Sequence, residues 1–130
     1  RDERPALVAT LHESAKRYDP ARVPSFGQTL VYGVEPVPPL VSAVVDRMNR
    51  SASAEERWAP LYYPVATSST EVIVDALGPQ NTVGVCVETW SGFDEARRVA
   101  MHKEIVLHLL VGIGVLAPAG RDTDPPEASR

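Results

Sequence analysis

The apolar positions of the chain repeat with helical spacing in three segments. In residues 5–18, leucine, valine, alanine and tyrosine recur every three or four positions behind Pro5, which suits the first turn of a helix. Residues 38–51 begin with a proline pair and carry a stripe of valine, leucine and methionine. Residues 102–116 form the third segment, which two glycines weaken near its end. The pattern predicts three helices.

Four other segments have the pattern of β-strands, with alternating or short continuous runs of apolar residues. They are residues 29–35, 60–65, 71–77 and 82–90. Prolines on both sides of the first segment predict that it lies at the edge of the sheet. The turn residues in "LGPQN" predict that the last two segments form an antiparallel hairpin.

These elements predict an α+β fold with a single antiparallel sheet packed on one face by about three helices. The length of 130 residues fits one domain, which we expect to cover residues 1–117. Residues 118–130 are polar and rich in proline, and we expect them to form a disordered tail. Because the chain begins with Arg1 instead of methionine, we expect it to be a piece of a longer protein.

Composition and charge exclude several classes of function. The net charge of -4 provides no basic surface for nucleic acid. No signal peptide is recognisable, and no apolar run reaches the roughly 18 residues that a membrane span requires. With Cys86 as the single cysteine, a disulfide framework is excluded. We therefore expect a cytoplasmic protein, and the excess of arginine over lysine suggests a bacterial source.

Metal and cofactor chemistry is not predicted. His12 falls near the polar side of the first predicted helix, where we expect a solvated side chain. His102 and His108 are six residues apart, so they lie on different helix faces and do not form a zinc-protease motif. Cys86 lies within a strand, where a thiolate is not stabilised, and we expect it to be a buried structural residue. No glycine-rich nucleotide loop is present either, so we expect neither cofactor nor metal.

Two carboxylates are candidates for acid–base chemistry. Asp75 in strand 71–77 and Glu88 in strand 82–90 both point away from the apolar side of their strands. In a hairpin, they could approach each other on the sheet face away from the helices. Carboxylates at short range raise the pKa of one member, which can then act as a general base. The competing interpretation is a pair of solvated surface acids.

Four aromatic residues are the candidates for binding. They are Trp58, Tyr62, Tyr63 and Trp90. Tryptophan and tyrosine bury large areas and are frequent in the energetically important parts of interfaces. The competing interpretation is that they fill the core or cover the edge of the sheet, and for Trp58 this interpretation is favoured.

The motifs "WAPL" at Trp58–Leu61, "VIVDALGP" at Val72–Pro79, "VGVCVE" and "RRVAMHKEIVLHLL" resemble the C-terminal part of the SMI1/KNR4 (SUKH) superfamily. The resemblance covers roughly residues 57–111. The chain has "VATSST" where that family usually has a glycine-rich turn, and it lacks the family's N-terminal "LP-x-x-Y" signature. The resemblance implies an α+β fold and a non-catalytic binding role, as in bacterial immunity proteins that neutralise toxins or in regulatory adaptors.

The resemblance and the absence of a catalytic motif favour a non-catalytic protein-binding module. Its predicted contacts are Trp58, Tyr62, Tyr63, Glu88 and Trp90. The acidic net charge would suit a basic partner. The alternative is a small α+β enzyme with a pocket between helices and sheet, in which Asp75 or Glu88 is the general base. A homodimer paired through the edge strand at 29–35 is a further hypothesis.

Overall fold

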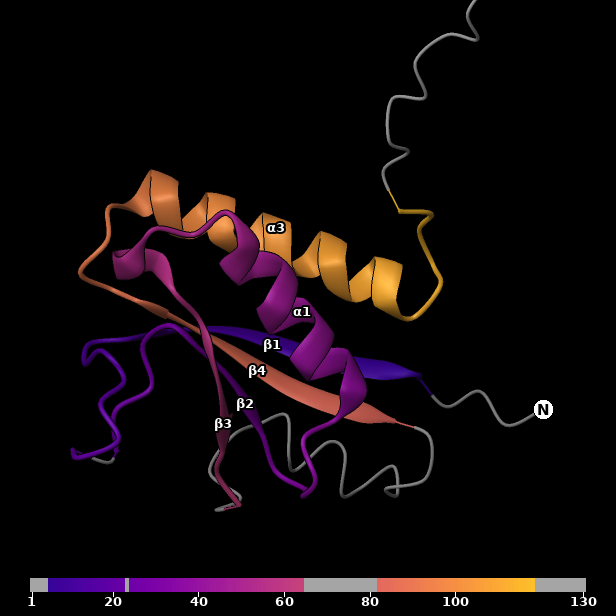
Figure 1. Ribbon diagram of the computed structural model, residues 1–130, viewed down its shortest axis with the longest axis horizontal. Helices are drawn as coiled ribbons and strands as arrows, with labels where there is room; N and C mark the ends of the chain where they lie inside the picture. Colours follow the sequence, from indigo (N-terminus) through magenta and orange to yellow (C-terminus); the bar gives the residue numbers. More distant parts are fainter. Residues whose placement is uncertain (1–4, 23, 65–81, 119–130) are drawn as a thin grey trace, which may run out of the picture.

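The structure, a computed structural model, describes residues 5–22, 24–64 and 82–118. Both α-helices of this part of the chain lie over the same face of one sheet (Figure 1). The elements follow in the order β1 (Leu7–Ser14), β2 (Thr29–Tyr32), α1 (Pro39–Arg50), the 3-10 helix η1 (Ala54–Glu56), β3 (Ala59–Tyr62), β4 (Val83–Trp90) and α3 (Glu95–Gly112).

The sheet is mixed, with the strand order β1-β4-β2-β3. β1 runs parallel to β4, and β2 runs parallel to β3. The two pairs are joined by antiparallel pairing of β2 with β4. Since parallel neighbours cannot be joined by a tight turn, the chain between β1 and β4 makes a long excursion that contains β2, α1 and β3.

The predicted fold class is wrong in two respects. The sheet is mixed instead of antiparallel, and the described residues form two α-helices instead of about three. The helix count is wrong because the segment predicted as the first helix is the strand β1, which also adds one of the two parallel pairs of the sheet. Its leucines and valines fit a helical repeat, but eight residue pairs with β4 place it in the sheet.

The predicted edge strand is also misplaced. β2 lies between β4 and β3 and is hydrogen-bonded on both sides. All four of its residues are buried. It therefore does not offer the free edge that the homodimer hypothesis requires. The outer edge of the sheet on the β4 side is formed by β1, which has no second strand partner among the described residues.

Other predicted elements are confirmed. The helix predicted at 38–51 contains α1, and the C-terminal helix is α3, which begins earlier than expected. This start is capped by Asp94, whose Oδ1 accepts a hydrogen bond of 2.8 Å from the backbone N–H of Arg97. The segment predicted at 60–65 overlaps β3, which begins one residue earlier, and the segment predicted at 82–90 contains β4. The predicted strand 71–77, its hairpin and nearly all of the predicted tail lie outside the described residues.

The core lies between the sheet and the two helices. On the sheet side it contains Leu30, Val85 and Val87, none of which is exposed to solvent. On the helix side, Ile105 of α3 is likewise fully buried, and α1 and α3 contact each other. Among the described residues, no helix is both long enough and apolar enough to cross a membrane.

The contribution of this core can be tested on α3. Ile105 is 0% exposed and Leu107 is 54% exposed, and each loses its branched side chain on substitution by alanine. We expect Ile105→Ala to lower the free energy of unfolding by about 2–5 kcal/mol, because it leaves a cavity. Leu107→Ala should change it by less than about 0.5–1 kcal/mol. Chemical denaturation measures both, and equal losses would contradict the position of the helix.

Candidate metal and acid–base site

Successive residues of β4 point to opposite faces of the sheet. Val85 and Val87 face the helices as part of the core, so Cys86 and Glu88 point to the other face. In the parallel register of β1 and β4, His12 lies directly opposite Glu88. The two strands thus place an imidazole, a thiol and a carboxylate together on the face away from α1 and α3.

These three side chains form a tight cluster. Glu88 Oε1 lies 3.9 Å from His12 Nδ1 and accepts a hydrogen bond of 3.5 Å from Cys86 Sγ. The possible ligand atoms of all three residues lie within 4.8 Å of one another. The His12 side chain is 43% exposed and the Glu88 side chain only 14%. The imidazole is therefore accessible to a ligand from solvent, while the carboxylate is largely enclosed.

The enclosure of Glu88 changes its titration. Burial raises the pKa of the Glu88 carboxyl above its ordinary range, because loss of solvent penalises the charged form. The hydrogen bond from Cys86 and the charge of His12 lower the same pKa, but burial is the larger effect. A carboxyl with a raised pKa exchanges protons closer to neutral pH, as a general acid–base catalyst must.

The donor set fits a zinc ion. Zinc is bound by imidazole, thiolate and carboxylate at about 2.0–2.3 Å, so the ligand atoms of a tetrahedral site lie roughly 3.4–3.6 Å apart. The distances of 3.5 and 3.9 Å from Glu88 Oε1 are close to these values. His12, the most exposed member, is the residue best placed to bind an ion that approaches from solvent.

Hydrogen bonds fix the backbone of β1 at His12 and of β4 at Glu88. Thr89 Oγ1 donates a hydrogen bond of 3.3 Å to the backbone carbonyl of His12. The carbonyl of Glu88 accepts a hydrogen bond of 2.7 Å from the backbone N–H of Gln28. Thr29 of β2 is paired with Glu88 and has no exposed surface. Glu88 is therefore fixed between β1 and β2 inside the sheet, not on its edge.

This cluster was not predicted from the sequence. The sequence predicts His12 on a helix and predicts no metal site, because the single cysteine and the widely spaced histidines match no metal-binding motif. The parallel pairing of β1 with β4 joins residues that are far apart in the sequence. Asp75, the predicted partner of Glu88, lies outside the described residues. The prediction that Glu88 points away from the helices is confirmed.

Two of the predicted binding residues differ strongly in exposure. Trp58 is 4% exposed and belongs to the core. The Asn49 side chain accepts a hydrogen bond from the backbone N–H of Trp58 and donates one to the backbone carbonyl of Trp58. Tyr62, in contrast, is 40% exposed, with its ring 5.8 Å from that of Tyr32. Trp58 is thus not available to a partner, whereas Tyr62 is.

The other two aromatic candidates are half-buried. Tyr63 packs edge-on against Phe26, with ring centres 5.0 Å apart. Trp90 packs edge-on against Phe93 at 5.2 Å, and the Arg17 guanidinium lies 5.3 Å from its ring centre. Both side chains make contacts within the domain that account for their aromatic character.

An apolar groove of about 510 Å³ lies between β1 and α3. Its lining residues are Leu11, Val99, His102, Lys103, Val106 and Leu107. Leu11 pairs with Val87 of the core face, so the groove is on the helix side of the sheet. Glu88 does not line it and points to the opposite face. In the predicted alternative, Glu88 lines a pocket between helices and sheet, but its side chain points to the opposite face of the sheet.

Comparison with solved structures shows a fold shared with Csd4, a cell shape determinant protein of Helicobacter pylori. The apo form is 18% identical with a TM-score of 0.67, and the match covers 90% of this chain and 32% of that chain. The tripeptide-bound form gives 18% and 0.68, covering 89% and 32%. The mDAP-bound form of Csd4, a D,L-carboxypeptidase, gives 18% and 0.67 with the same coverage.

This similarity establishes the fold alone, because the identity is low. The chain spans about a third of the length of the Csd4 chains that it matches. No protein-family model and no curated protein matches the sequence. None of these comparisons tests the resemblance to the SMI1/KNR4 (SUKH) superfamily, which stays a prediction.

The burial of Glu88 predicts a pH-dependent cost in stability. Because its pKa is raised on folding, the folded state binds this proton more tightly than the unfolded state. The resulting stability is present below the ordinary glutamate pKa and is lost as the pH rises through the raised one. Glu88→Gln stays neutral, so we expect it to melt at a higher temperature than the wild type at pH 7, with the difference closing near about pH 4.

The exposed Glu104 provides the control, since Glu104→Gln changes a charge on the outer side of α3. Thermal melts of the three proteins across this pH range measure the effect. A wild type that is more stable than Glu88→Gln at pH 7 would mean that the contacts with His12 and Cys86 outweigh burial.

Proposed function

We propose that this chain forms part of a zinc-dependent peptidase of the carboxypeptidase type, with His12 as a metal ligand and Glu88 as the catalytic acid–base. The observation that carries the proposal is the cluster of His12, Cys86 and Glu88. The fold shared with Csd4, a D,L-carboxypeptidase also solved with a bound tripeptide, supports a peptide as substrate.

In this proposal each residue of the cluster has a separate role. His12 would hold the metal, and its Nδ1 faces the Glu88 carboxylate. When bound, zinc supplies a more acidic water molecule and polarises the peptide carbonyl. Cys86 orients the carboxylate through its hydrogen bond to Oε1. The raised pKa of Glu88 suits a group that must both accept and return a proton.

The chemistry of Glu88 follows from peptide hydrolysis. It removes a proton from the attacking water, whose oxygen forms a bond to the carbonyl carbon of the substrate. It then delivers that proton to the amide nitrogen as the carbon–nitrogen bond breaks. The products are a carboxylic acid and an amine, and Glu88 returns to its starting state.

The described residues contain only part of such a centre. A catalytic zinc usually has three protein ligands besides water. Although the spacing of the three donors fits a zinc ion, only His12 serves as a ligand in this proposal, because Glu88 transfers the proton and Cys86 donates a hydrogen bond to Glu88. The solved Csd4 chains are about three times as long as the matched region. We therefore expect further ligands from protein outside the described residues.

The metal role of His12 can be tested by titrating the protein with zinc while recording NMR spectra of the histidine rings. We expect the His12 signals to shift and His12→Ala to lose the binding. His108 is the control, because it pairs with Glu104 on α3 at 3.6 Å, away from the cluster. Zinc binding that survives His12→Ala and is lost in His108→Ala would contradict the assignment.

The catalytic role of Glu88 can be tested with the zinc-loaded intact protein and peptides that end in a D,L or an L,L bond. We expect release of the terminal amino acid, and a fall of about 10²–10⁴-fold in kcat for Glu88→Gln. Glu104→Gln should keep full activity. Undiminished hydrolysis by Glu88→Gln would remove this residue from the mechanism.

The function predicted from the sequence, non-catalytic protein binding as in an immunity protein or adaptor, stays a prediction. Of its predicted contacts, Tyr62 has a substantially exposed side chain, while Trp58 is in the core. A basic partner and a cytoplasmic location likewise stay predictions.

A further inference from the structure

Gln28 has a backbone conformation that non-glycine residues rarely adopt. Its φ is 68°, in the left-handed region, and it immediately precedes β2. Such a conformation is energetically unfavourable and persists where the surrounding structure enforces it. The residue is also 3% exposed, although its side chain is a polar amide. A strained and buried glutamine requires an explanation in terms of its contacts.

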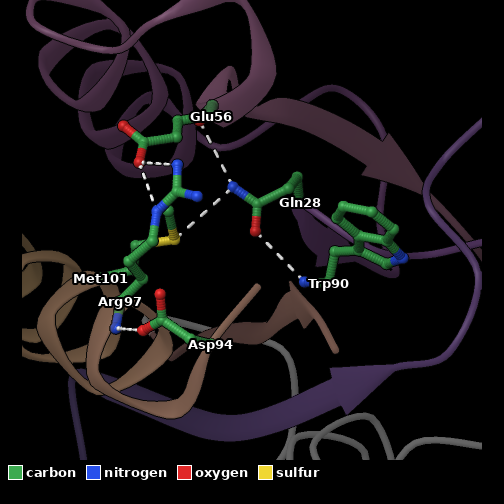
Figure 2. A network of polar contacts seen from close by, with 6 residues as sticks. All are labelled: Gln28, Glu56, Trp90, Asp94, Arg97 and Met101. Carbon is green, nitrogen blue, oxygen red and sulfur yellow. Dashed lines mark hydrogen bonds and ion pairs between the residues drawn. The ribbon is translucent and has the colours of Figure 1, made fainter. Parts of the chain in front are cut away.

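The contacts of Gln28 join three parts of the domain (Figure 2). Its side-chain Oε1 accepts a hydrogen bond of 3.2 Å from the backbone N–H of Trp90. Its Nε2 donates one of 3.3 Å to the backbone carbonyl of Glu56 and lies 3.7 Å from Met101 Sδ. The buried amide therefore has partners on β4, η1 and α3, and both of its polar atoms are satisfied.

The main chain of the same residue binds β4 a second time. Its N–H donates a hydrogen bond of 2.7 Å to the carbonyl of Glu88. Together with the bond between Oε1 and the Trp90 N–H, this contact holds β4 at two residues, Glu88 and the one two positions beyond it. In its left-handed conformation, Gln28 thus binds the part of β4 that carries the Glu88 carboxylate.

Gly27, the residue before Gln28, connects this contact with β4 to the chain just after β1. The N–H of Gly27 donates a hydrogen bond of 2.9 Å to the carbonyl of Lys16. A Cβ atom on Gly27 would lie 2.9 Å from that oxygen and 2.9 Å from Trp90 Cβ, so only glycine allows this approach. The Gly27–Gln28 corner therefore fastens the chain after β1 to the end of β4.

A charged pair closes the corner on the helix side. Arg97 binds the Glu56 carboxylate through Nε and Nη2 (Figure 2). Its guanidinium also lies 4.3 Å from the centre of the Phe93 ring. This pair connects η1 with the first turn of α3, the same two elements that receive the Gln28 amide. The two helical elements that Gln28 contacts, η1 and α3, are therefore also joined to each other by an ion pair.

We propose that Gln28 is a positioning residue, which fixes β4 so that the Glu88 carboxylate faces His12 across the β1–β4 pair. The inference rests on the proposed function, because the position of Glu88 matters for a reaction only if Glu88 takes part in one. The geometry itself is independent of that reaction: one buried residue binds the backbone of Glu88 and of Trp90 while it anchors both to the helical layer.

The test replaces the amide without emptying the site. Gln28→Met has a side chain of similar length but cannot accept from the Trp90 N–H or donate to the Glu56 carbonyl. Asn49→Ala is the matched control, because Asn49 also makes two hydrogen bonds to backbone groups, those of Trp58, and lies away from the cluster. Urea unfolding identifies the conditions in which both variants remain folded.

Two measurements then separate positioning from general support of the fold. NMR titration of the metal-free protein gives the pKa of Glu88, which we expect to fall towards the ordinary glutamate range in Gln28→Met as water reaches the carboxylate. Calorimetric titration with zinc gives the affinity of the site, which we expect to fall about 10–100-fold in this variant. Asn49→Ala should change neither quantity.

The possible results separate the positioning role from the proposed function. If the wild type binds zinc and Gln28→Met keeps both the Glu88 pKa and the affinity, Gln28 is not a positioning residue. The positioning role also fails if Asn49→Ala alters both quantities as much as Gln28→Met does. If the wild type binds no zinc but Gln28→Met still shifts the Glu88 pKa, the metal assignment fails and the positioning role stands.

Discussion

The parallel pairing of β1 with β4 is the interaction on which the rest of the structure depends. Its register sets His12 opposite Glu88 and fixes which side chains of β4 face the helices. Because parallel neighbours need a long connection, it also requires the excursion that contains β2, α1 and β3. β2 returns antiparallel on the far side of β4 and thereby encloses Glu88 within the sheet. Core and candidate site thus have one common cause.

How much of the fold could be predicted from the sequence depended on whether each element has a regular buried side. α1 has one, with Val41, Val44 and Val45 buried along it, and its predicted bounds, 38–51, differ from the structure by one residue at each end. β1 has none: Ala9 and Leu11 lie on its core-facing side and are nevertheless exposed, because the helices do not cover the edge strand completely. Without alternation in burial, its apolar residues fit a helical repeat equally well, and only the partner strand decides.

The candidate site was less predictable than the fold, because it is assembled by register. The alternation of β4 was sufficient to place Cys86 and Glu88 on one face, and that part of the prediction is confirmed. His12 belongs to a distant segment, and no spacing rule connects it with Glu88. A prediction of the site would have required the pairing of β1 with β4, which local sequence does not specify. The aromatic residues were candidates because of their size, yet Trp58 is accounted for by the core.

The energetically unfavourable features of Glu88 and Gln28 lie close together, near the C-terminal end of β4. The Glu88 carboxyl is enclosed although burial penalises its charge, and Gln28 adopts a left-handed backbone and buries an amide to bind the same strand. A domain selected for stability alone would gain by replacing a largely enclosed carboxylate with a neutral side chain. Strained and desolvated groups tend to cluster at the functional sites of proteins. Their coincidence at Glu88 therefore favours this face of the sheet as the functional site, rather than the apolar groove beside α3.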